Sequence, residues 1–151
     1  MALTHVGPAG EAKMVDIGPK PVSRRMARAA GRIRLRPETV ALIKDNQIRK
    51  GDVLAAARIA AISGAKRTSE LIPLCHNIPI DVVDVRFEIK ADGIVIEARA
   101  ACEARTGIEM EALTAVAVAA LTIYDMCKAV DKTMVIEDIR LLEKTKDAIQ
   151  R

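Results

Sequence analysis

Aromatic residues are almost absent from this sequence. The 151 residues include one Phe, Phe87, one Tyr, Tyr124, and no Trp. Proteins that bind single-stranded nucleic acid need aromatic rings on which the bases can stack. The composition therefore argues against a surface that reads RNA.

Cysteine and histidine are also scarce. The three cysteines, Cys75, Cys102 and Cys127, are odd in number and show no CxxC spacing, which argues against a disulfide framework or a structural zinc site. The two histidines, His5 and His76, are far apart in the chain, and the side chains of the adjacent Cys75 and His76 diverge. We therefore expect reduced thiols and no metal site.

Long hydrophobic runs are missing as well. No basic N-terminal segment is followed by an apolar run, and no apolar stretch reaches the roughly 20 residues that a membrane span needs. Half of the residues are hydrophobic and 29% are charged, which is typical of a folded soluble protein. The sequence predicts a cytoplasmic protein with one hydrophobic core.

Basic residues outnumber acidic residues by 24 to 20, which gives a net charge of +4. A basic cluster near the N-terminus comprises Lys20, Arg24, Arg25, Arg28, Arg32, Arg34 and Arg36. A solvated basic face would explain this cluster. An anion site would explain it too, because the planar guanidinium group of Arg matches phosphate geometry.

Glycine and proline are concentrated at the N-terminus. Residues 1–21 contain Gly7, Pro8, Gly10, Gly18, Pro19 and Pro21 and show neither a helical nor a strand period. We predict a flexible or ligand-ordered arm over residues 1–21 and a single domain over residues 22–151.

Hydrophobic periodicity divides the rest of the chain into strands and helices. Alternation predicts strands over residues 31–36, 81–90, 94–100 and 133–142, with a hairpin turn at 91–93. Helical spacing predicts helices over 37–45, 53–71 and 108–130, and prolines bracket a rigid connector over 73–79. The order strand, helices, strand, strand, helix, strand predicts an α+β fold of the ferredoxin-like split βαβ type, an antiparallel sheet packed against helices. This topology hosts many activities and does not identify one.

Two polar residues stand out in the predicted loops. Lys50 precedes Gly51 and a helix N-terminus, where backbone N–H groups and the helix dipole favour an anion. His76 lies between prolines in an otherwise apolar connector. A surface lysine and a structural histidine are the alternatives to a functional role.

The long helix predicted at 108–130 carries charged residues at both ends. Glu109 and Glu111 lie in its first turn, where the helix dipole favours carboxylates. Asp125 and Lys128 are three residues apart on one face, which suits a simple ion pair. If this helix is buried, burial lowers the pKa of the lysine while the carboxylate raises it, and such a competition tunes lysines that transfer protons. The sequence leaves open which effect dominates.

Several segments of the chain resemble a known family. They are residues 14–16, 50–53, 65–68, 71–76, 106–114 and 121–130, and they include the strings LIPLCH and TIYDMCKAV. From about residue 3 to residue 142 the chain is similar to the cyclic pyranopterin monophosphate synthases, the family of molybdenum-cofactor biosynthesis protein C.

This resemblance implies a lyase of molybdenum-cofactor biosynthesis, with residues 22–151 as the catalytic domain. Such enzymes convert the GTP-derived (8S)-3',8-cyclo-7,8-dihydroguanosine 5'-triphosphate into cyclic pyranopterin monophosphate and release diphosphate. The resemblance also implies a homohexamer, a trimer of dimers, with active sites at subunit interfaces. We expect no required cofactor and no nucleic-acid or membrane partner. Mg²⁺ could accompany the substrate triphosphate, although the sequence shows no dedicated cage for it.

The resemblance further implies the site residues. The catalytic candidates are Lys50, Asp125 and Lys128, and the substrate-binding candidates are Leu74, Cys75, His76, Met110, Glu111 and Arg25. We assign Lys50 and Lys128 to proton transfer and charge stabilisation, and Asp125 to orienting and tuning Lys128. Arg25 and His76 would hold phosphates. The family often ends in a glycine-rich basic tail, whereas residues 144–151 contain no glycine, so we assign no lid to the C-terminus.

Two functions of other classes remain open. A ferredoxin-like module that senses a nucleotide would not need Asp125 and Lys128, so its affinity should survive the loss of both. A basic nucleic-acid-binding domain would lose affinity steeply as salt increases.

Helix geometry suggests an active site built from two chains. Glu111 and Asp125 are 14 residues apart, which is about 21 Å along an unbroken helix, and they fall within about 40° of one face. Two such helices, antiparallel across a two-fold axis, would bring Glu111 of one chain near Asp125 of the other. A kinked helix or a long substrate is the alternative.

Overall fold

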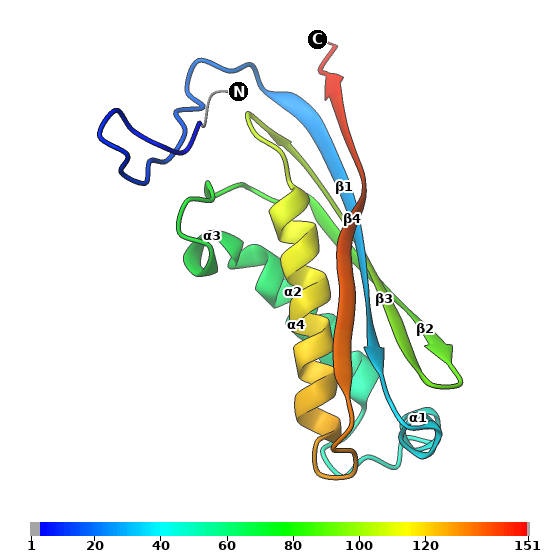
Figure 1. The fold of residues 1–151 in the computed structure, drawn as a ribbon. Coiled ribbons are helices and arrows are strands. Elements are labelled where there is room, and N and C mark those ends of the chain that lie inside the picture. The colour runs from blue at the N-terminus through cyan, green and yellow to red at the C-terminus, as the bar shows by residue number, and fades with distance from the viewer. Residues whose placement is uncertain (1–3, 151) are drawn as a thin grey trace.

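Residues 4–150, which the computed structural model describes, form four strands and four helices (Figure 1). The strands are β1 (Ser23–Arg34), β2 (Val82–Lys90), β3 (Gly93–Ala104) and β4 (Val135–Ala148). The helices are α1 (Pro37–Lys44), α2 (Val53–Lys66), α3 (Thr68–Leu71) and α4 (Glu109–Cys127). Residues 1–3 of the predicted arm, and residue 151, lie outside the described residues.

The strands form one sheet in the order β2-β3-β1-β4, and every neighbouring pair is antiparallel. Helix α4 packs on β1, β3 and β4, and α2 packs on α4 and β2. Both helices therefore cover the same face of the sheet (Figure 1). The predicted α+β, ferredoxin-like fold is confirmed.

The core lies between α4 and the sheet and depends on small residues in β1. Ala27, Ala29 and Ile33 face the helices and are completely buried. Gly31 takes the position between them, where an added Cβ would lie only 2.7 Å from Cγ1 of Val116 on α4. Small side chains in β1 thus allow the helix to approach the strand closely.

Helix α4 is long and apolar enough to cross a membrane by length and composition alone. In the fold, however, half of that segment is buried, and the helix lies against α2 and the sheet. This packing assigns α4 to the core of the fold.

Strands β1 and β4 are longer than the sequence predicted. β1 begins at Ser23 rather than at residue 31, and β4 continues to Ala148 rather than ending at residue 142. The two strands pair along this whole length, from Ser23 opposite Ala148 to Arg34 opposite Val135. Alanine suits either face of a sheet, so the alanine-rich start of β1 shows no visible alternation.

The helix predicted over residues 53–71 is two helices, because α2 ends at Lys66 and α3 begins at Thr68. The buried Thr68 hydroxyl donates to the carbonyl oxygen of Ala65 at 2.9 Å, and the N–H of Arg67 bonds to the carbonyl oxygen of Gly64 at 3.0 Å. A local side-chain hydrogen bond of this kind competes with regular helix. Smaller corrections are that β3 extends to Ala104 and α4 ends at Cys127, instead of residues 100 and 130.

The face of the sheet away from the helices carries most of the basic cluster. Strand pleating places Arg24, Arg28, Arg32 and Arg34 together on this face. These arginines form ion pairs with carboxylates of the neighbouring strands. Arg28, for example, lies 3.0 Å from Glu97.

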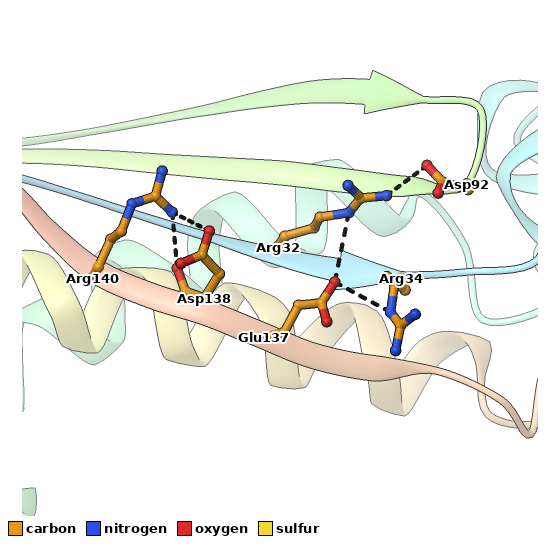
Figure 2. A network of polar contacts seen from close by, with 6 residues as sticks. All are labelled: Arg32, Arg34, Asp92, Glu137, Asp138 and Arg140. Atoms are coloured by element: carbon orange, nitrogen blue, oxygen red, sulfur yellow. Dashed lines mark hydrogen bonds and ion pairs between the residues drawn. The ribbon is translucent and has the colours of Figure 1, made fainter.

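Figure 2 shows the part of this network nearest to the β2–β3 turn. Arg32 lies 2.6 Å from Asp92 and 4.0 Å from Glu137, and Arg34 lies 3.2 Å from Glu137. These arginines are therefore paired within the sheet, which favours the solvated-face interpretation for this part of the cluster. Arg25 points to the helix face instead.

Candidate active site

The three catalytic candidates meet at one end of the molecule. Asp125 lies in the last turn of α4, Lys128 caps its C-terminus, and Lys50 lies in the loop between α1 and α2. Nζ of Lys128 is 2.7 Å from Oδ1 of Asp125, and Nζ of Lys50 is 3.0 Å from Oδ2. Lys50 also donates to the carbonyl oxygen of Asp125 at 3.1 Å. One carboxylate thus bridges two ammonium groups, one of them 75 residues away in the sequence.

The loop that carries Lys50 is shaped by its neighbours. Gly51 has a φ of 112°, in the left-handed region that favours glycine. Asp52 then caps α2 by accepting the N–H of Ala55 at 3.0 Å. These two features fix the end of the loop from which Lys50 reaches Asp125.

This group of three residues is exposed, so the buried ion pair considered from the sequence is wrong. The side chains of Lys50, Asp125 and Lys128 are 46%, 56% and 54% exposed. Asp125 lies on the exposed side of α4, as does Leu121. Hydrogen bonds from Lys128 and Lys50 lower the pKa of Asp125, and the hydrogen bond and charge of Asp125 raise the pKa of Lys128. Pairing, not burial, therefore dominates.

The substrate-binding candidates gather at the other end of α4, around a cleft of about 570 Å³. Its lining includes Leu74, Cys75, His76, Met110 and Glu111. The connector after α3 and the first turn of α4 provide these residues, and the N-terminal arm adds Val15, Ile17 and Lys20. Five of the six predicted binding residues thus share one cavity.

Glu111 is the unusual group in this cleft. Its side chain is buried, and its Oε2 has no hydrogen-bond partner among residues 4–150. Burial, with a smaller contribution from the charge of Glu109, raises the pKa of Glu111 to about 6, although a backbone hydrogen bond acts in the opposite direction. Burial and the charges of the two glutamates also raise the pKa of the Cys75 thiol. A buried carboxyl group of this kind can bind ligand N–H groups or exchange a proton near neutral pH.

His76 connects the cleft to the N-terminal arm. Its Nε2 lies 2.6 Å from the carbonyl oxygen of Val15. Because a carbonyl oxygen only accepts, Nε2 must carry the proton and donate it. Only Nδ1 is then left to contact a ligand, so the predicted role of His76 in holding phosphate depends on that nitrogen.

Arg25, the sixth binding candidate, lies in an adjoining cleft of about 400 Å³ that shares Lys20 and Thr106 with the first. Lys144 and Lys146 also line this second cleft, and neither is among the candidates predicted from the sequence. Their two-residue spacing would have placed them on one face, but only if the last strand had been extended to include them. Four basic side chains thus surround this cleft.

The two groups of candidates do not meet within one chain. Glu111 and Asp125 belong to the same continuous helix and are 14 residues apart, which is about 21 Å along its axis. In Figure 1 the arm and the start of α4 lie at one end of the molecule, whereas α1 and the end of α4 lie at the other.

Within residues 4–150, no group of three or more His, Cys, Asp or Glu side chains is placed to hold a metal ion. Cys75, Cys102 and Cys127 all carry free thiols.

The sequence model of the MoaC family matches residues 14–147 of the chain. The chain belongs to the MoaC family. A cyclic pyranopterin monophosphate synthase of Peptoclostridium acidaminophilum is 55% identical over 145 residues, which cover 96% of this chain and 92% of that protein. A protein of the same name from Chloroflexus aurantiacus is 57% identical over 144 residues, which cover 94% of this chain and 88% of that protein.

A longer relative is named differently. The molybdenum cofactor biosynthesis bifunctional protein of Chlorobaculum tepidum is 55% identical over 145 residues, which cover 96% of this chain but 46% of that protein. All nine candidate residues lie inside the part of the chain that the MoaC model matches. The first part of the arm, before residue 14, lies outside it.

Proposed function

We propose that the protein is a cyclic pyranopterin monophosphate synthase, a lyase of molybdenum-cofactor biosynthesis. It would convert (8S)-3',8-cyclo-7,8-dihydroguanosine 5'-triphosphate into cyclic pyranopterin monophosphate and diphosphate. Identity of 55% and 57% to two synthases of that name, over at least 94% of the chain, carries this proposal. The meeting of Lys50, Lys128 and Asp125 supports it.

The reaction makes two demands on the site. Protons must move while a purine-derived ring opens and recloses as a pterin, and a substrate oxygen must attack the α-phosphorus as the bond to the diphosphate breaks. Lys128, whose pKa is raised by Asp125, is a cation at neutral pH and suits proton donation and charge stabilisation. Lys50 would act with it, and Asp125 would orient both ammonium groups.

The clefts suit the two parts of the substrate. Glu111, buried and without a partner among the described residues, would bind the N–H groups of the purine-derived ring, with Leu74, Cys75 and Met110 around it. Arg25, together with the basic residues around the second cleft, would hold the phosphates. We propose that no protein-bound cofactor is required and that any Mg²⁺ arrives with the triphosphate.

We further propose that each active site uses two chains of a homohexamer, a trimer of dimers, in the cytoplasm. The separation of about 21 Å between Glu111 and Asp125 supports a shared site. Leu121 and Tyr124 expose apolar surface on α4 between the two ends, and Ile139 and Leu141 do so on the edge strand β4. An open strand edge with apolar neighbours favours self-association.

The direct test is incubation of the protein with the cyclic dihydro-GTP substrate, followed by mass spectrometry of the product and an assay of diphosphate. Wild type should form both products, and Asp125→Asn should form little. Asp138→Asn, which changes an exposed carboxylate in the sheet network of Figure 2, should behave like wild type. Substrate binding without turnover, unaffected by loss of Asp125 and Lys128, would favour a nucleotide-sensing module instead.

A further inference from the structure

A buried carboxylate lies in the turn that joins α4 to β4. The side chain of Asp131 is completely buried. Its Oδ2 accepts the N–H of Arg36 and the hydroxyl of Thr39, both at 2.9 Å. Its Oδ1 accepts the N–H of Thr133 at 2.9 Å and the Thr133 hydroxyl at 2.8 Å. Four donors from two separate segments therefore converge on one carboxylate.

Asp131 binds the start of α1. Arg36 is the N-cap residue of that helix, and its own side chain makes no capping hydrogen bond. The Asp131 carboxylate accepts the N–H of this N-cap residue and the hydroxyl of Thr39 in the first turn, and it puts a negative charge at the helix N-terminus, where the dipole favours it. The Arg36 guanidinium adds an ion pair, with Nε 3.6 Å from Asp131, and donates to the carbonyl oxygen of Val130. The start of α1 is thus tied to the turn after α4.

Both tied segments lead to the catalytic candidates. The N–H of Asp131 bonds to the carbonyl oxygen of Cys127 at 3.0 Å, so the turn continues directly from the end of α4 that bears Asp125 and Lys128. On the other side, α1 ends at Lys44, and the loop that follows it carries Lys50. The hydrogen bonds of Asp131 and the contact between Lys50 and Asp125 therefore join the same two parts of the chain, residues 36–50 and 125–133.

Asp131 is not suited to proton transfer. Burial alone raises its pKa, but the hydrogen bonds from Arg36, Thr133 and Thr39 outweigh burial and lower the pKa to about 2. The group is therefore ionised throughout the neutral pH range. A buried charge is costly unless it is fully hydrogen-bonded, and the donors around Asp131 meet that condition.

We propose that Asp131 is a positioning residue for the reaction: it holds the start of α1 against the end of α4 and thereby sets the contact of Lys50 with Asp125. This inference rests on the proposed function for its kinetic consequence. Asp131 itself touches no catalytic side chain, and it acts through the two segments that it joins.

Four variants test this role. Asp131→Asn keeps the size of the side chain but removes its charge, and it replaces one accepting oxygen with an NH₂ group that cannot accept hydrogen bonds. We expect kcat to fall at least about tenfold, because small misplacements of catalytic groups are costly. KM should stay within about twofold of wild type, since the side chain of Asp131 contacts none of the residues that line the proposed binding clefts. Thr39→Val removes one hydrogen bond at equal volume and should lower kcat less, whereas Thr39→Ser keeps the hydroxyl and should retain wild-type kcat. Val85→Ala, a buried change on β2, is the control for lost stability alone.

A second measurement does not depend on activity. The pKa of the Asp125 carboxyl is followed by ¹³C NMR, assigned with Asp125→Asn. In Asp131→Asn, and to a smaller extent in Thr39→Val, loss of the Lys50 contact should move this pKa up toward its ordinary value. Thr39→Ser and Val85→Ala should leave it unchanged.

The outcomes separate the two proposals. If wild type forms no product, the proposed function is wrong, and the NMR titration still decides whether Asp131 positions Lys50. If folded Asp131→Asn keeps the wild-type Asp125 pKa, or loses no more kcat than Val85→Ala at the same melting temperature, the positioning role is wrong. If Asp131→Asn does not fold, the comparison of Thr39→Val with Thr39→Ser decides instead. Equal kcat and equal Asp125 pKa in these two variants would show that the positioning role is wrong.

Discussion

Two inactive variants should restore activity when they are combined in one oligomer. Glu111→Ala removes the buried carboxylate from the cleft, and Asp125→Asn weakens the acceptor that holds Lys50 and Lys128. In a mixed oligomer, one kind of site takes Asp125 from the first variant and Glu111 from the second. That site is intact, whereas the reciprocal site is doubly defective.

The size of the recovery follows from the geometry. Glu111 and Asp125 are about 21 Å apart along α4, so one chain cannot bring both to one small reacting group. With random mixing of equal amounts, each of the two required residues is present with a probability of one half, and about a quarter of all sites are intact. This fraction is the same for a dimer and for a hexamer of such dimers. If each variant alone retains about 1% of wild-type turnover, the mixture should gain about 25-fold.

The assay is diphosphate release after co-refolding from denaturant, with native mass spectrometry to verify mixed oligomers. Each variant refolded alone, and the two refolded separately and then combined, serve as controls. Verified mixed oligomers without any recovery would show that each chain carries its own complete site, and the two-chain proposal would be wrong.

Three further predictions concern the catalytic candidates, the buried Glu111 and metal removal. Lys50→Ala, Lys128→Ala and Asp125→Asn should each lower kcat at least about 10²-fold with an unchanged circular dichroism spectrum, as expected for positioned acid–base groups, and near-normal turnover by Asp125→Asn would remove that residue from the mechanism. Glu111→Gln should raise the melting temperature at pH 7 by about 5 °C and leave it unchanged at pH 4, because a carboxyl whose pKa rises from 4.5 to about 6 on folding costs about 2 kcal/mol of stability once the pH exceeds both values. Equal melting temperatures at pH 7 would mean that the ionised Glu111 carries no such cost. Turnover should survive treatment with a chelator followed by gel filtration, because lysine and arginine side chains supply the positive charge of the site, and a loss reversed only by one equivalent of metal per site would contradict this.

Most of the fold could be predicted because it is encoded in short-range patterns. The alternation of Val83, Val85, Phe87 and Ile89 with charged residues predicted strand β2, and the helical spacing of apolar residues over 108–130 predicted helix α4. The predictions were wrong at positions where the sequence shows no clear periodicity. Alanine in β1 hides the strand period, and the break at Arg67 depends on a hydroxyl of Thr68 that is polar by composition and buried only in the folded protein.

The sequence identified most residues of the candidate site, but it did not show how these residues are arranged in space. The motifs around Lys50, His76 and Asp125 identified the residues, since these motifs are contiguous in the sequence. Whether the Asp125–Lys128 pair is buried depends on which face of α4 turns to the sheet, and the sequence left this open. Lys144 and Lys146 were missed because their contribution needs β4 to extend beside Arg25.

The sequence by itself determined the order of the elements, the apolar face of each strand and the residues available for chemistry, because side-chain periodicity and turn preferences act over a few neighbouring residues. Only the tertiary structure decided that Lys50 meets Asp125 across 75 residues, that Asp131 binds Arg36, 95 residues earlier, at the start of α1, and that α4 separates the catalytic candidates from the cleft. Contacts between distant segments depend on how helices pack on the sheet, and that packing is a property of the whole chain.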